Sequence, residues 1–242
     1  SAENTTLNVK NTEIYSTYAI YVKSGNNKVT IDKSSLNGWA ALDISNNLEA
    51  VSNNSISVSN STLIGVDYLP NNGWNDYSVV QIGAQKNLAL SITSSTVKNI
   101  IISGNRTDVI GYSDSYSSSS DVTISIADTD LINTDENGNS SIINYGVDAN
   151  VASTMLIIDS LSTMTSANGK NFEIAGNNSI LTLSTLDGNV TITVPTGTEL
   201  TEDILNSVED IEGYKFDGWF TDAQYTNPVA VGTKITEDTT IY

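Results

Sequence analysis

The chain of 242 residues carries 28 acidic and 10 basic side chains, a formal net charge of −18. This charge repels nucleic acid and anionic membrane surfaces, so we expect neither as a partner. Cysteine and histidine are absent, which excludes disulfides and removes the commonest general base and the commonest transition-metal ligand. The composition fits an exported bacterial protein, and the lack of cysteine would also fit a cytosolic one.

The first residues do not form a targeting segment. Ser1-Ala2-Glu3-Asn4 lacks the basic and apolar regions of a signal peptide, so we expect that a secreted form has already lost it. No run of about 18 apolar residues occurs, and we expect no insertion into a membrane.

A short pattern recurs through residues 1–188. It reads apolar, any, apolar, any, any, Ser or Thr, any, apolar, and its first copy is Leu7, Val9, Thr12 and Ile14. The alternating apolar pair is typical of a short strand. A second apolar pair and a Gly or Asn turn follow in most units. Later copies begin at Val29, Ile56, Leu90, Ile124 and, with one inserted residue, Leu156; a seventh begins at Leu181 and then departs from the pattern.

These units predict an all-β fold in which residues 1–188 form a right-handed parallel β-helix. One unit cannot bury its own Ile, Val and Leu, but stacked units share a continuous core. The five starts Leu7, Val29, Ile56, Leu90 and Ile124 should then point inward. The Ser/Thr positions should form a ladder whose hydroxyls hydrogen-bond from unit to unit. A β-sandwich of many short strands is the alternative, although sandwiches do not repeat such a signature in register.

Aromatic residues on two insertions predict a binding surface. The insertions are Asp67–Tyr77 and Tyr112–Ser120, and insertions of repeat proteins commonly carry function. Exposed aromatic rings stack on sugars or anchor protein partners. The alternative is that Trp74 folds back as a structural cap, and we expect Trp39 to be buried at a corner. The residues assigned to the surface are Tyr68, Trp74, Tyr77, Tyr112 and Tyr116.

A group of aspartates gives a weak indication of a calcium site. Asp128, Asp130 and Asp135 carry the oxygen ligands that calcium prefers. Their spacing is not that of an EF-hand, and solvated loop acids are the alternative. We expect no other cofactor.

The sequence contains no recognisable catalytic constellation. Histidine is missing, and Arg106, near Asp108, is the only arginine. Uronate-degrading β-helix enzymes need such residues, so we expect no activity on pectin or pectate. A pair of carboxylates at glycosidase spacing could still arise from the many acids.

Residues 189–242 depart from the repeat. A strand at Val190–Val194 precedes a short predicted helix at Thr201–Val208, for which Thr201 is the expected N-cap. Gly213-Tyr214-Lys215-Phe216-Asp217-Gly218-Trp219-Phe220-Thr221-Asp222 and the ending Ile235–Tyr242 then follow. These two stretches resemble the internalin B-type, or Listeria–Bacteroides, repeat. The opening strand of that family is not clear, although Leu181–Gly188 could supply it, and its closing Ala-Lys-Trp is missing.

The resemblance implies a β-grasp-like fold and a bacterial surface protein, with Tyr214, Phe216, Trp219 and Tyr242 forming a small core and its rim. We therefore expect two domains, 1–188 and 189–242, in a monomeric, extracellular protein of the bacterial cell surface. Its expected function is non-enzymatic: an adhesin, or a module that contacts a host or matrix protein or a glycan. The alternatives are a carbohydrate-binding or polysaccharide-degrading β-helix and a purely structural spacer.

Overall fold

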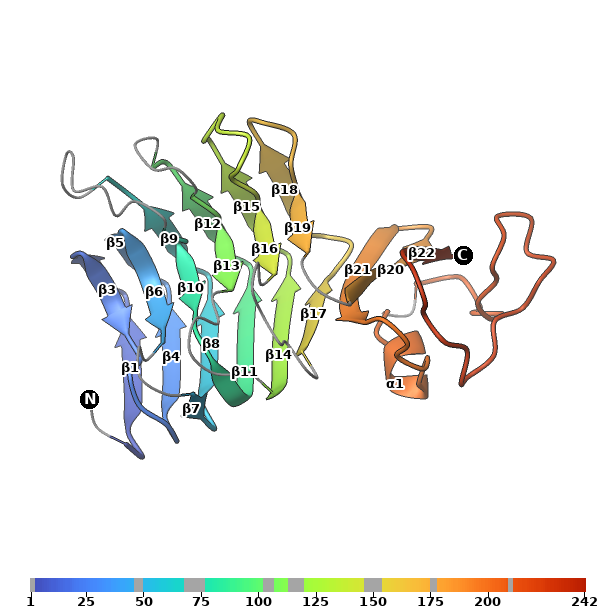
Figure 1. Ribbon diagram of the computed structural model, residues 1–242, viewed down its shortest axis with the longest axis horizontal. Coiled ribbons are helices and arrows are strands. Elements are labelled where there is room, and N and C mark those ends of the chain that lie inside the picture. The colour runs from blue at the N-terminus through green and yellow to red at the C-terminus, as the bar shows by residue number, and fades with distance from the viewer. Residues whose placement is uncertain are drawn as a thin grey trace.

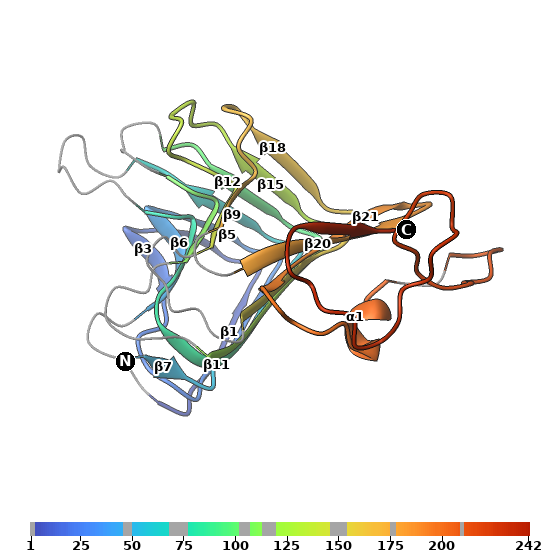
Figure 2. The same cartoon turned by 45° about the vertical axis from the view of Figure 1, so that its right-hand side comes forward.

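The computed structural model describes residues 3–45, 50–67, 77–101, 107–112, 120–145, 154–174, 178–208 and 211–242. Within them the chain is all-β apart from one short helix, and most strands pair in parallel. Six successive units each contribute one strand to each of three sheets, here called sheets A, B and C. Figures 1 and 2 show these strands side by side along the long axis.

The strands of the six units follow one another in the same order through the three sheets. Sheet A takes β1 (Thr6–Lys10), β4 (Lys28–Asp32), β8 (Ser55–Ser59), β11 (Gln85–Thr93), β14 (Ser120–Ala127) and β17 (Thr154–Ile158), and the short β7 (Val51–Ser52) also pairs with β11. Sheet B takes β2 (Glu13–Tyr15), β5 (Ser35–Gly38), β9 (Thr62–Gly65), β12 (Thr96–Asn99), β15 (Asp130–Asn133) and β18 (Thr163–Ser166). Sheet C takes β3 (Tyr18–Tyr21), β6 (Ala40–Ile44), β10 (Val80–Ile82), β13 (Ile110–Tyr112), β16 (Ile143–Tyr145) and β19 (Phe172–Ile174).

The register of sheet A confirms the alignment of the repeats. The five repeat starts are direct neighbours: Leu7, Val29, Ile56, Leu90 and Ile124 pair in that order. The last four are buried in one aliphatic core, as predicted. Leu7 also points inward, toward Ile20, Val22 and Val29, but it is 40% exposed. The reason is that β1 forms the edge of the sheet, where only one neighbouring strand covers it.

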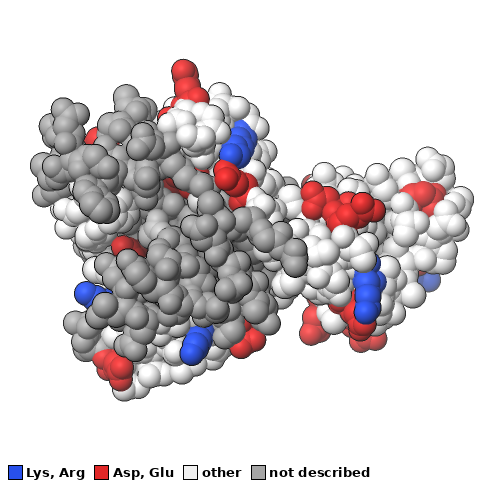
Figure 3. All heavy atoms as spheres, viewed as in Figure 1, with Lys and Arg blue, Asp and Glu red and all other residues white. Residues whose placement is uncertain are grey.

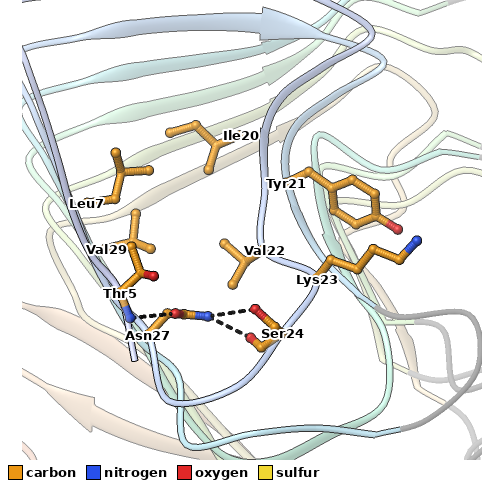
Figure 4. Close-up of a pocket in the computed structure, with 9 residues that line it drawn as sticks. All are labelled: Thr5, Leu7, Ile20, Tyr21, Val22, Lys23, Ser24, Asn27 and Val29. Atoms are coloured by element: carbon orange, nitrogen blue, oxygen red, sulfur yellow. Dashed lines mark hydrogen bonds between the residues drawn. The ribbon is translucent and has the colours of Figure 1, made fainter. Parts of the chain in front are cut away.

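A hollow of about 140 Å³ lies at this edge. Leu7, Ile20, Val22 and Val29 line it, and Figure 4 shows these four side chains pointing toward one another. Tyr21 alternates with Ile20 and Val22 along the chain, so its ring points to the opposite side of the strand.

The Ser/Thr ladder exists, and its hydroxyls bond from unit to unit as expected, with backbone N–H groups as their partners. In four of the five steps the hydroxyl oxygen accepts the backbone N–H of the equivalent residue in the preceding unit. Most of the hydroxyls donate to the carbonyl two residues earlier. The corner residue just before the ladder has a positive φ, even at Lys33 and Asp128. At this corner the backbone leaves the sheet, and the N–H of the ladder residue loses its partner in the sheet. The Ser or Thr hydroxyl of the next unit accepts that N–H instead. The N–H to Oγ distances are 3.2 Å for Thr12 to Ser34, 3.1 Å for Ser34 to Ser61, 3.1 Å for Ser61 to Ser95 and 3.1 Å for Thr129 to Ser162.

A second core organises the C-terminal part. The hairpin of β20 (Asn178–Thr185) and β21 (Gly188–Pro195) joins β22 (Thr239–Ile241) on one side and pairs antiparallel with β17 on the other. The expected domain boundary at 188/189 thus falls at the start of β21. Leu181 and Leu183 of β20 pack with the C-terminal residues in this core. Sheet A continues from the repeats into the C-terminal part without a break.

The aromatic residues of the C-terminal motif have unequal roles. Trp219 is buried, and its ring N–H donates to the carbonyl of Leu205 at 2.9 Å. Tyr214 and Phe216 are mostly exposed and so lie outside the core itself, and the ring of Phe216 contacts that of Trp219 with centroids 5.4 Å apart. Helix α1 (Glu202–Leu205) is shorter than predicted, and Thr201 caps it by accepting the N–H of Ile204 at 3.2 Å.

Candidate functional site

An aromatic cluster lies at one end of sheets B and C. Tyr18 and Tyr21 come from β3, Trp39 from the link between β5 and β6, and Tyr77 from the segment before β10. The ring centroids of Tyr18 and Tyr21 are 5.3 Å apart, and those of Tyr18 and Tyr77 are 5.9 Å apart. Trp39 stacks on Tyr77 at 5.7 Å. Four rings from three successive units therefore form one continuous surface.

The hydroxyl groups of the cluster are held in a low-polarity setting. The hydroxyls of Tyr18 and Tyr77 share a hydrogen bond of 2.9 Å. Burial, followed by this hydrogen bond, holds the pKa of Tyr18 well above its usual value, and burial also raises the pKa of Tyr21. Both phenols therefore remain neutral at physiological pH.

A carboxyl group lies directly beside these rings. Asp43 on β6 pairs in register with Tyr21 on β3, and only 3% of Asp43 is exposed. The Ser45 hydroxyl donates to the carboxyl at 2.5 Å. Burial raises the pKa of Asp43 to about 6, against the lowering effect of that bond. Among the described residues, no Lys or Arg forms an ion pair with Asp43.

A positive charge already rests on the cluster. The Lys23 ammonium lies 5.8 Å from the centroid of the Tyr21 ring, within the range of a cation–π interaction. Tyr21 is 39% exposed, so its ring faces solvent in part. The cluster therefore combines neutral aromatic faces, a buried acid and one accessible ring.

The structure places only part of the predicted binding surface. Tyr77 belongs to the cluster, whereas Tyr68, Trp74 and Tyr116 lie outside the described residues. Tyr112 ends β13, where its backbone pairs with Ile82, and its side chain is also outside the description.

Sequence reasoning missed Tyr18 and Tyr21 and expected Trp39 to be buried, although Trp39 is partly exposed. The second apolar pair of each unit could have indicated the neighbours of Tyr21. Aligning Ile20 with Leu42, which the structure confirms, places Tyr21 beside Asp43.

The three aspartates suggested for calcium lie in different environments. Asp128 is exposed at a corner and accepts the Ser94 hydroxyl at 2.9 Å, and Asp130 is exposed at the start of β15. Asp135 is buried and accepts the hydroxyls of Thr107 and Ser140 at 2.7 and 2.6 Å. The described part of the chain contains no group of three or more His, Cys, Asp or Glu side chains suited to a metal.

A second buried acid belongs to the same interior network as Asp135. One Asp108 oxygen accepts both the N–H and the hydroxyl of Ser141, and the other accepts the Asn144 amide at 2.9 Å. Asn133 and Asn99 bond to each other beside it at 2.9 Å. These bonds give both acids structural partners. Arg106, which we considered with Asp108, lies outside the described residues.

Comparison with known families identifies the C-terminal part. Residues 175–242 match the Listeria-Bacteroides repeat domain, and this repeat is typical of surface or extracellular proteins. No curated protein and no solved structure matches the chain. No helix in the described residues is both long and apolar enough to cross a membrane. The chain is thus an all-β protein of stacked parallel sheets that ends in a Listeria-Bacteroides repeat.

Proposed function

We propose that this protein is a non-enzymatic binding protein of the bacterial cell surface. In this proposal residues 1–188 are a right-handed parallel β-helix that presents a binding face, and the C-terminal repeat is a spacer toward the cell wall. The observation that carries it is the aromatic cluster on a rigid, in-register stack of strands, next to a repeat typical of surface proteins.

The stack suits the presentation of a binding surface. Strands of neighbouring units lie about 5 Å apart, so side chains from three units meet without a long loop. The repeated backbone bonds fix these side chains in place, and a prearranged surface loses little entropy on binding. The continuation of sheet A into the repeat supports a stiff connection between the two parts.

The alternative of a polysaccharide-degrading enzyme has less support. Asp108 and Asp135 are engaged by hydroxyl and amide donors inside the protein. Asp43 remains as an acid beside aromatic rings, and aromatic rings with an acid also suit a carbohydrate-binding role without catalysis. The two candidate functions are distinguished by their products. An enzyme releases reducing or unsaturated sugar ends, and a binding protein does not.

Three measurements test the proposal. Antibodies against residues 1–188 should label intact cells of the source bacterium, and the purified chain should bind a component of a glycan and extracellular-matrix array. The same chain should release no unsaturated or reducing ends from pectin or pectate. Absence of surface labelling, or uronate cleavage that is lost in Arg106→Ala, would refute it.

A further inference from the structure

We propose that the aromatic cluster of Tyr18, Tyr21, Trp39 and Tyr77, together with Asp43, binds an alkylated ammonium group such as that of choline. This inference rests on the proposed binding function and names the ligand chemistry of the same site. It requires rings that are neutral and partly accessible, a nearby negative charge, and a surface that attracts cations.

The rings satisfy the first requirement. A cation is attracted to the negative face of an aromatic ring, and several rings around one cation are the usual arrangement for quaternary ammonium groups. Tyr18, Tyr21 and Tyr77 contact one another, and Trp39 extends the surface. Lys23 shows that an ammonium group is already accommodated on the Tyr21 ring.

Asp43 supplies the charge. It is an outward-facing residue of sheet C in register with Tyr21, yet it is almost fully buried. Burying a carboxylate without a positive partner is costly, and none of the described Lys or Arg residues pairs with it. A bound cation would provide the missing partner. The net charge of −18 would in addition concentrate cations near the protein.

The few free hydrogen-bond acceptors at the cluster favour a fully alkylated ammonium, such as that of choline, over a primary ammonium. A lysine-type ammonium carries three N–H donors and is strongly hydrated, so it needs several acceptors to leave water. Here the Tyr18 and Tyr77 hydroxyls are bonded to each other and the Ser45 hydroxyl is bonded to Asp43. A methylated ammonium has no such demand and gains from contact with rings.

The groups around Asp43 make binding depend on pH in one direction. Tyr18 and Tyr21 of β3 are its titratable neighbours and stay neutral, Tyr77 contacts Tyr18, and Lys23 lies over the Tyr21 ring. Only Asp43 therefore changes charge near neutrality, with its pKa at about 6. Its ionised form attracts a cation, so binding should be tighter above this pH and should release a proton.

The test is calorimetric titration of the full 242-residue chain with choline chloride, at pH 7.5 and pH 5. The control ligand is 3,3-dimethylbutan-1-ol, which has the shape of choline without its charge. We expect millimolar choline binding that weakens about tenfold at pH 5, because only about a tenth of Asp43 is then ionised. The neutral alcohol should bind at least several-fold more weakly.

Variants assign the binding to the cluster. Tyr21→Ala should weaken choline binding roughly fivefold or more, whereas Tyr15→Ala, an exposed tyrosine on β2 outside the cluster, should leave it unchanged. Asp43→Asn should bind choline at pH 7.5 at least as weakly as the natural chain does at pH 5, without pH dependence. Far-UV circular dichroism should show that each variant remains folded.

Three outcomes would overturn the inference. Equal binding of choline and the neutral alcohol would indicate a merely apolar patch, and tighter binding of butylammonium than of choline would indicate a primary amine. The third outcome is that antibodies label the protein on cells and the chain binds on the array, but the chain does not bind choline. This outcome would reject choline as the ligand and leave the proposed function standing.

Discussion

The two parts of this molecule bury their cores in different ways. The stacked units use Ile, Val and Leu side chains that repeat from strand to strand and meet their equivalents in register. The C-terminal part closes its small core with Trp219 over the hairpin of β20 and β21. Burial in the stack is therefore distributed over many similar contacts. In the repeat it depends strongly on one large side chain, because a small domain has little other area to bury.

The charge also differs between the two parts. Residues 195–242 hold 10 acids and 2 bases in the sequence, a net charge of −8 from 48 residues. Figure 3 shows red acidic spheres on the visible face of this part and few blue ones. Copies of this part therefore repel one another.

Removal of the Trp219 side chain should have the largest effect on stability. Trp219→Ala should destabilise the C-terminal part by about 3–5 kcal/mol, because it empties the core and removes the partner of the Leu205 carbonyl. Thermal unfolding should then show an early transition of this part, while the aliphatic stack melts at its usual temperature. Tyr214→Ala, at an exposed position of the same motif, is the control and should change little. Loss of the whole structure in a single early transition would show that the two parts are not separable.

Replacement of the buried Asp43 should have the next largest effect, and it should raise the stability instead of lowering it. The pKa of Asp43 is about 6 in the folded chain, above the value of 3.8 of an unperturbed aspartate. The folded state thus holds its proton more tightly than the unfolded state, and stability falls as pH rises from about 4 to about 6. Asp43→Asn should therefore be more stable than the natural chain by about 2–3 kcal/mol at pH 7.5.

Denaturant unfolding at several pH values measures this difference. The advantage of Asp43→Asn should shrink below pH 6 and nearly vanish at pH 4, and the comparison of two chains cancels the other acids. A constant difference across this range would mean that Asp43 titrates as an ordinary carboxyl.

Removal of one hydroxyl from the Ser/Thr ladder should have the smallest effect on stability. Ser61→Ala removes the acceptor for the Ser34 N–H and leaves that buried donor without a partner, at a cost of about 1–2 kcal/mol. Ser57→Ala, on the exposed face of the same strand β8, should change stability by less than about 0.5 kcal/mol. Equal effects of the two substitutions in denaturant unfolding would show that the ladder adds nothing beyond the sheet itself.

Several features could be predicted because they are periodic. The spacing of Val29, Ile56, Leu90 and Ile124 gave the register of sheet A, since equivalent residues must stack to share one core. The C-terminal motif predicted the matching repeat, and Thr201 was identified as the helix cap. The candidate site was only partly predictable. Tyr77 was found from its insertion, whereas Tyr18 and Tyr21 sit within a strand and become candidates only when the second apolar pairs of successive units are aligned.

The sequence by itself determined the repeating unit, its parallel register and the family of the C-terminal part, because apolar spacing and turn residues act over a few positions. Only the tertiary structure decided that Leu7 is exposed at an edge, that the ladder hydroxyls accept backbone N–H groups, and that Asp43 is almost fully buried. These features depend on which strands become neighbours across 22 to 34 residues of intervening chain, and local patterns contain no record of such contacts.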